Sequence, residues 1–168
     1  MPSTARPAAG PSIAPRSAVL RQLYAYWERQ RAGRRMPSRR DMDPLEIEPR
    51  LLPWIMILDV EEAPRRFRYR LIGTRLVEVM DRDLTGHYLD DLRELLPAVD
   101  TTIDRCNAVV DSCWPLNFED DLVDVIGSRV WAERLALPLG ETDTRVEAIM
   151  VGFAAQDHPP GPDEPEAA

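Results

Sequence analysis

Two histidines, His87 and His158, are the side chains best suited to acid–base chemistry or nitrogen ligation near neutral pH in this 168-residue chain. His158 lies in a proline-rich acidic stretch. His87 follows Gly86 at a turn, where it could face solvent or point into a pocket. The sequence contains no Glu-x-x-His, His-x-x-x-His or Cys-x-x-Cys spacing. These spacings are the local signatures of metal sites, so the sequence predicts none.

Nucleophilic and phosphate-binding motifs are also missing. There is no Gly-x-Ser-x-Gly sequence and no glycine-rich phosphate loop. Cys106 and Cys113 are the two cysteines, and we interpret them as reduced, buried thiols. We therefore predict no catalytic residues and no enzymatic activity. One acidic cluster is explained by helix caps and turns; it comprises Asp81, Asp83, Asp90 and Asp91.

The charge of the chain limits its partners. The net charge is −8, which argues against nucleic-acid binding because phosphate contacts need a basic field. Six arginines between Arg29 and Arg40 form the one basic patch. This patch could bind an anion, or it could form local ion pairs with the acids that follow it. No run of eighteen apolar residues and no signal-peptide core is present, so we expect no membrane span and a cytoplasmic protein.

The strongest structural pattern is the alternation over residues 66–71. Phe67, Tyr69 and Leu71 alternate with arginines, which predicts a half-buried strand. After Gly73 the apolar spacing becomes helical through Leu76 and Met80. A strand that turns into a short helix in this way is suited to form one wall of a pocket.

The remaining patterns divide the chain into a tail (1–16), an N-terminal helix (17–33), a domain (34–155) and an acidic tail (156–168). Both tails should be disordered because they have little to bury. An apolar run at 51–60 predicts a strand that pairs with the stretch 66–74, and a longer helix is expected at 98–112. We predict strands at 114–118, 129–139 and 145–153, with an acidic loop at 119–127.

This order predicts an α+β fold: a five-stranded antiparallel sheet with helices on one face and an N-terminal amphipathic helix. It is the element order of the PAS domain. Four segments in order also resemble a family of small bacterial PAS-like proteins, over roughly residues 20–153. They are the Gly33-Arg-Arg-Met-Pro-Ser-Arg stretch, Phe67-Arg-Tyr-Arg-Leu-Ile-Gly-Thr74, Arg82-Asp-Leu-Thr-Gly86 and Glu133-Arg-Leu-x-Leu-Pro-Leu139.

The resemblance implies a sensory or regulatory PAS fold without enzymatic activity of its own. We expect this module to bind a small ligand, a protein partner or both in signalling. It does not identify a ligand. The cysteine motif of flavin-binding light sensors is absent, and the helix at 98–112 lacks the histidine of haem-binding members. Two alternatives stay open: a small pocket enzyme of the isomerase or dehydratase type, and a ligand-free structural adaptor.

Two sets of candidate residues follow from the expected fold. A homodimer is expected through the N-terminal helix, because its apolar residues spread around more surface than one sheet contact should cover; these are Val19, Leu20, Leu23, Tyr24, Tyr26 and Trp27. The expected pocket is apolar and aromatic and suits a small, mostly uncharged ligand. Its residues are Phe67, Tyr69, Leu71, Leu76, Met80, His87, Trp131, Leu135, Ile149 and Val151, although a one-residue slip would exchange a strand's faces.

Overall fold

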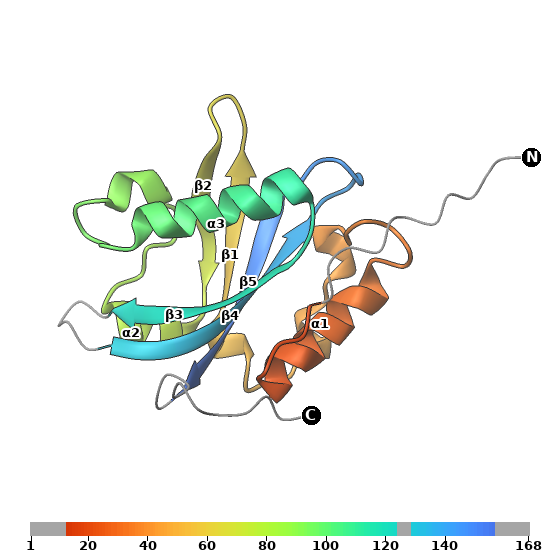
Figure 1. Cartoon of the computed structure of the whole chain (residues 1–168), viewed down its shortest axis with the longest axis horizontal. Helices are drawn as coiled ribbons and strands as arrows, with labels where there is room; N and C mark the ends of the chain where they lie inside the picture. The colour runs from red at the N-terminus through yellow and green to blue at the C-terminus, as the bar shows by residue number, and fades with distance from the viewer. Residues whose placement is uncertain (1–12, 124–128, 157–168) are drawn as a thin grey trace, which may run out of the picture.

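The computed structural model describes residues 13–123 and 129–156. Its five strands form one antiparallel sheet in the order β2-β1-β5-β4-β3 (Figure 1). The predicted α+β fold is therefore confirmed. The helices are α1 (Ala18–Gln30), α2 (Thr74–Met80) and α3 (Val99–Ser112), and the strands are β1 (Ile55–Glu61), β2 (Arg66–Ile72), β3 (Leu116–Val123), β4 (Arg129–Leu139) and β5 (Ala148–Gln156). Short 3₁₀ turns lie at Arg39–Asp41, Pro44–Glu46, Leu52–Trp54 and Leu89–Leu92.

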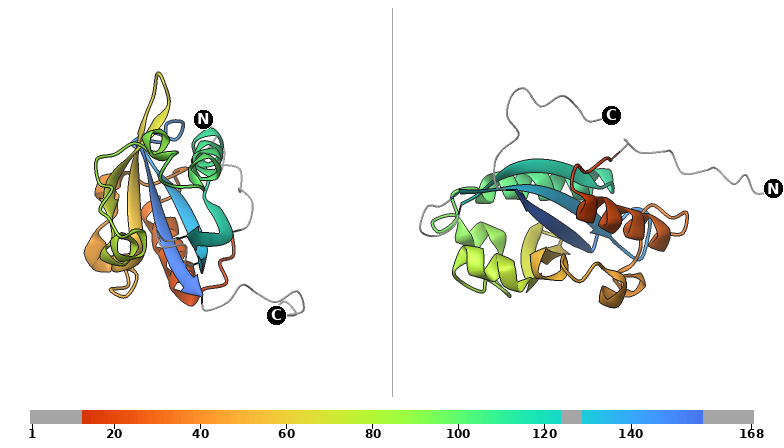
Figure 2. Two further views of the ribbon diagram at one scale, coloured as in Figure 1. Left: turned by 90° about the vertical axis from the view of Figure 1, so that its left-hand side faces the viewer. Right: turned by 90° about the horizontal axis from the view of Figure 1, so that it is seen from below.

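The two faces of the twisted sheet carry different elements (Figure 2). We call the face that carries Tyr69 and Phe153 the inner face. The helical layer of α2, α3 and the turn at Leu89–Leu92 covers it, and α3 runs across the sheet in Figure 1. Helix α1 packs against β4 and β5 on the opposite, outer face. The chain thus has three layers, and the residues of β4 and β5 face either the helical layer or α1.

Helix α1 shares one core with the sheet. Leu20, Leu23 and Trp27 are buried, and the Trp27 indole N–H donates to the Pro138 carbonyl oxygen at 3.0 Å. The helix approaches β5 so closely that a Cβ on Gly152 would lie 2.6 Å from Leu23 Cδ2. A Cβ at position 152 would therefore require the Leu23 and Leu20 side chains to shift.

A buried carboxylate fixes the start of α1. Glu133 Oε1 accepts a hydrogen bond from the Arg16 main-chain N–H, and Oε2 accepts one from that of Ser17, each at 2.7 Å. The Asn117 side-chain amide donates to Oε1 at 3.0 Å. Glu133 is fully buried, so these donors replace the water that its charge would otherwise bind. Strand β4 therefore anchors the N-terminal end of the helix.

Several predicted bounds differ from the structure. The apolar run at 51–60 begins with a 3₁₀ turn at Leu52–Trp54, and β1 starts only at Ile55. Pro53 explains this difference because it cannot donate a ladder hydrogen bond. The acidic segment 119–123, predicted as a loop, continues strand β3 and pairs with β4. Cross-strand pairing there overrides the low strand propensity of its acids.

The predicted tails lie largely outside the described residues, which begin at 13 and end at 156. Residues 13–16 are described. Ile13 is partly buried against the core, and the Arg16 main chain is bound by Glu133. The described residues that precede α1 are therefore attached to the core.

Candidate functional site

A cavity of about 80 Å³ lies between the inner face of the sheet and the helical layer. Met56, Tyr69, Arg134 and Phe153 line it from four different strands, and the remaining wall comes mainly from Met80, Leu89 and residues 96–99 and 102. The strands place these four residues together because residues paired across neighbouring strands share a face: Arg134 is opposite Phe153 in the β4–β5 ladder.

Arg134 introduces a charge into this mostly apolar space. Its side chain is only 9% exposed, and its Nη2 lies 2.8 Å from Asp120 Oδ1. The same Nη2 donates weakly to the Asp121 carbonyl oxygen at 3.4 Å. The guanidinium also lies 5.7 and 5.1 Å from the ring centroids of Phe118 and Phe153. Burial lowers the pKa of Arg134, an effect that the Asp120 carboxylate opposes.

Two neutral polar groups accompany Arg134. Burial raises the pKa of Tyr69 well above its usual value and raises that of the Cys106 thiol to about 12. The Arg134 charge acts in the opposite direction on both. At neutral pH Tyr69 is therefore a phenol that can donate a hydrogen bond, and Cys106 is a thiol without nucleophilic character.

The structure places the predicted pocket residues in three groups. Tyr69 and Met80 line the cavity. Others are buried in the core, and those on strands share the inner face by register; this group comprises Phe67, Leu76, Ile149 and Val151. The third group lies elsewhere and comprises Leu71, His87, Trp131 and Leu135.

A β-bulge explains the position of Leu71. Ile57 pairs with Leu71 and Leu58 pairs with Tyr69, so Arg70 is the extra residue between them. The extra residue exchanges the faces, and Leu71 is 46% exposed. The prediction that Leu71 points inward is therefore wrong. His87 is exposed as well, at the turn after Gly86.

Trp131 and Leu135 lie on the outer face of β4, so the prediction that they point into the pocket is wrong. Continuous pairing puts Leu135 opposite Gly152, the residue that lies beneath α1. Trp131 has the same parity as Leu135 along the strand and shares this outer face. The inward positions are those of Arg134 and its even-numbered neighbours, which corresponds to the one-residue slip that the alternation left open.

Sequence reasoning overlooked Arg134 as a cavity residue. A usable signal was present, since Glu133 and Arg134 are adjacent opposite charges in an apolar strand. Adjacent strand residues point to opposite faces, so both faces of a buried strand must hold a charge. Such a pair predicts two buried polar sites, one on each side of the sheet.

The predicted dimer residues are largely used within the chain. Leu20, Leu23, Tyr26 and Trp27 are buried, and Val19 and Tyr24 are partly buried against the core. The four buried residues therefore leave no free apolar surface for a second copy, and the prediction is wrong for them. Most of the apolar surface of helix α1 is buried within the chain, because the sheet and the segment 42–51 contact the helix from two sides.

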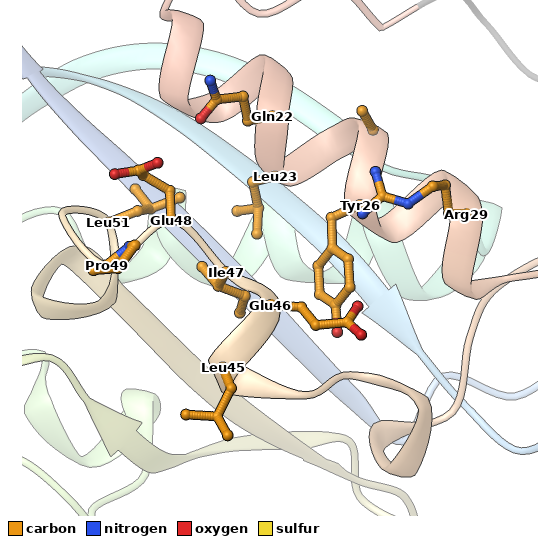
Figure 3. A pocket seen from close by; sticks show the side chains of 11 residues that line it. Gln22, Leu23, Tyr26, Arg29, Leu45, Glu46, Ile47, Glu48, Pro49 and Leu51 are labelled. Atoms are coloured by element: carbon orange, nitrogen blue, oxygen red, sulfur yellow. The ribbon is translucent and has the colours of Figure 1, made fainter.

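A second, more open hollow of about 370 Å³ lies between α1 and residues 45–51 (Figure 3). Tyr26 and Arg29 border it from the helix, and Glu46 and Ile47 border it from the facing segment. The Tyr26 hydroxyl donates to the Asp43 carbonyl oxygen and accepts from the Asp43 N–H. These bonds show that Tyr26 has a structural role in holding the segment against the helix.

The arginines of the 29–40 patch contact groups both near to them and far from them in the sequence, including the Ser112 carbonyl oxygen and Glu141. Arg31 bonds to Glu28 at 2.9 Å, Arg34 pairs with Asp41, and Arg39 pairs with Asp59. Within residues 13–123 and 129–156, no group of three or more His, Cys, Asp or Glu side chains could hold a metal ion. Among those same residues, no helix has the length and apolar character needed to cross a membrane.

Comparisons with known proteins were made for sequence and structure. No curated protein matched the sequence. Among solved structures, the Rhodobacter sphaeroides LOV protein superposes with a TM-score of 0.49 and 6% identity, over 61% of this chain and 58% of that chain. The PAS domain from Bordetella pertussis BvgS superposes with a TM-score of 0.40 and 13% identity, over 63% of this chain and 76% of that chain. The chain thus matches less than two thirds of the LOV protein.

The match to a protein-family model covers more of the chain than the matches to solved structures. A family model described as a PAS domain matches residues 16–153, which include every helix from α1 to α3 and strands β1 to β4, with most of β5. The matched region contains the sheet, the helical layer and the cavity between them. This chain therefore belongs to the PAS domain family.

Proposed function

We propose that this protein is a non-catalytic sensory module that binds a small molecule in the cavity between the sheet and α3. PAS domains are in general sensory or regulatory, which supports the class of function. The cavity supports sensing by ligand binding, since four strands and the helical layer all contribute to its wall. A molecule bound there would contact most of the fold at once.

One observation carries the proposal: Glu133 and Arg134 are neighbours on β4 and serve opposite faces. Arg134 lines the cavity, while Glu133 holds the start of α1. A ligand that shifts Arg134 therefore acts on the strand that anchors the helix. Because protein interiors are closely packed, such a shift is transmitted to its neighbours. Helix α1 would then report the state of the cavity to a partner protein.

Partner binding includes self-association, and we keep a homodimer as part of the proposal. Its surface cannot be built from the buried side chains of α1. Leu45, which is 91% exposed and borders the hollow beside α1, is the residue through which a second copy could approach this end of the molecule. Light scattering of the purified chain at increasing concentration tests this point, and a monomer at all concentrations contradicts it.

The alternative of a pocket enzyme has little support. Acid–base catalysis needs a titratable pair within reach of a substrate. His87 is exposed and outside the cavity. Asp121 borders the cavity, but it follows the inward-facing Asp120 on β3, so its side chain belongs to the outer face.

The decisive experiment compares hydrogen exchange of α1 in protein with and without its small molecule. Native mass spectrometry of the purified full chain first detects a co-purifying molecule, which is then removed by dialysis or partial unfolding. We expect the amides at the start of α1 to exchange faster after removal. Identical exchange in both samples, with a molecule demonstrably bound, contradicts transmission through β4.

A further inference from the structure

The charges around Arg134 do not balance. Arg105 and Arg134 both pair with Asp120, so two guanidinium groups share one carboxylate. Arg105 and Asp120 remain about one quarter exposed, whereas Arg134 is nine-tenths buried. The cluster of these three side chains carries one net positive charge, located beside the cavity.

Arg134 also has unused hydrogen-bonding capacity. Its Nε is buried and has no hydrogen-bond partner among the described residues. A buried donor that belongs to a charged group loses its interactions with water on folding and gains nothing in return. An acceptor atom brought into the cavity would remove this deficit, and a negatively charged acceptor would also balance the cluster.

The rest of the cavity indicates what the remainder of a bound ligand would be. Met56, Met80, Leu89, Val99 and Phe153 provide an apolar wall. The volume of about 80 Å³ is well below the ~300–1,000 Å³ of pockets for drug-sized ligands, so the molecule has few atoms. Tyr69 adds a neutral hydrogen-bond donor on the same wall.

We propose that the cavity binds a small monocarboxylate, with its carboxylate on Arg134 and the Tyr69 hydroxyl and its short alkyl chain against the apolar wall. This inference rests on the proposed function and specifies its ligand class. A single negative charge matches the net charge of the cluster. A phosphate dianion would exceed it and would bury a second charge without a partner, and an amine would add a second positive charge beside Arg134.

Three compounds with the same carbon chain test the proposal on the unmodified protein. Sodium propionate, 1-propanol and n-propylammonium chloride are titrated separately at constant ionic strength, and thermal shift and calorimetry measure binding. We expect propionate to raise the melting temperature in a saturable manner and the other two to leave it unchanged. If 1-propanol binds as well as propionate, the assignment of an anion is wrong while a ligand-binding module stands.

Two variants locate the site. Arg134→Gln should weaken propionate binding by about tenfold or more, because a charge-assisted hydrogen bond is lost. Tyr69→Phe removes only a hydroxyl and should weaken binding by a few fold. Arg93→Gln is the matched control, since Arg93 is exposed, pairs with Asp100 and does not line the cavity. It should bind propionate as the parent chain does.

The outcomes separate the two levels of the proposal. Propionate binding that survives in both Arg134→Gln and Tyr69→Phe overturns the carboxylate site. If Arg134→Gln does not fold, the comparison of Tyr69→Phe with the parent chain still decides the matter. If none of the three compounds binds and native mass spectrometry finds no co-purifying molecule, both the carboxylate assignment and the ligand-sensing function fail.

Discussion

Glu133→Gln tests how strongly strand β4 holds the start of α1. The substitution keeps the shape of the side chain but replaces one acceptor oxygen by an NH₂ group. Glu133 Oε1 and Oε2 accept the main-chain N–H groups of Arg16 and Ser17, each at 2.7 Å. Glutamine can accept only one of these, so the other N–H faces a donor. The amide also lacks the charge that strengthens the remaining bonds.

The expected loss of stability follows from these contacts. One charge-assisted hydrogen bond contributes about 1.5–3 kcal/mol, and burial of a neutral amide in place of a carboxylate offsets part of the loss, so we expect about 2 kcal/mol. With a urea m-value near 2 kcal/mol/M, the unfolding midpoint falls by about 1 M. Hydrogen exchange of the first turn of α1 should accelerate more than exchange in α3.

The matched control is Glu78→Gln. Glu78 pairs with Arg75 at 2.7 Å, and both side chains are about 60% exposed, so this pair contributes little. Its urea midpoint should stay close to that of the parent chain. Equal midpoints for Glu133→Gln and the parent, with unchanged exchange in α1, would refute the view that Glu133 anchors the helix.

Three further predictions concern the core. Gly152→Ala places a Cβ 2.6 Å from Leu23 Cδ2, which forces this side chain to shift, so urea unfolding should show a loss of about 1–3 kcal/mol. Tyr69→Ala removes a buried ring and should cost on the order of 3 kcal/mol in the same assay. The pKa values of Cys106 and Tyr24 are raised to about 12 from 9.0 and 10.0, because burial disfavours their charged forms. Stability from these groups is complete below about pH 9 and is lost as the pH rises towards 12, which pH-dependent urea unfolding measures; a flat profile over pH 8–11 contradicts the assignment.

Much of the fold is encoded in local sequence periodicity. The helical spacing of Leu20, Leu23 and Trp27 predicts α1, and the change of period after Gly73 predicts α2. Alternation along 129–139 likewise predicts β4. These elements could be recognised because the residues that determine each one lie within a few positions of each other. The order of elements then indicated the PAS fold.

The lining of the cavity could not be predicted from local patterns alone. Alternation divides β4 into two sets of residues, but it does not say which set faces α3. Leu135 was therefore expected in the cavity, whereas Arg134 lies there. Leu135 and the other odd-numbered residues of β4 face α1. Both faces of this sheet are covered, so apolarity does not distinguish the inner face from the outer one. That distinction depends on helix α1, which is far from β4 in the sequence.

Residue types and near spacing were enough to predict most of the helices and strands and the antiparallel sheet, although the acidic segment 119–123 was expected as a loop and is part of β3. The tertiary structure decided which charged side chains were buried and on which side. Only packing from distant segments put Arg134 beside Tyr69 and Phe153, Glu133 beneath the start of α1, and a bulged Arg70 in β2 that turned Leu71 outward. Burial and pairing are properties of contacts between distant segments, and periodicity along one segment does not contain them.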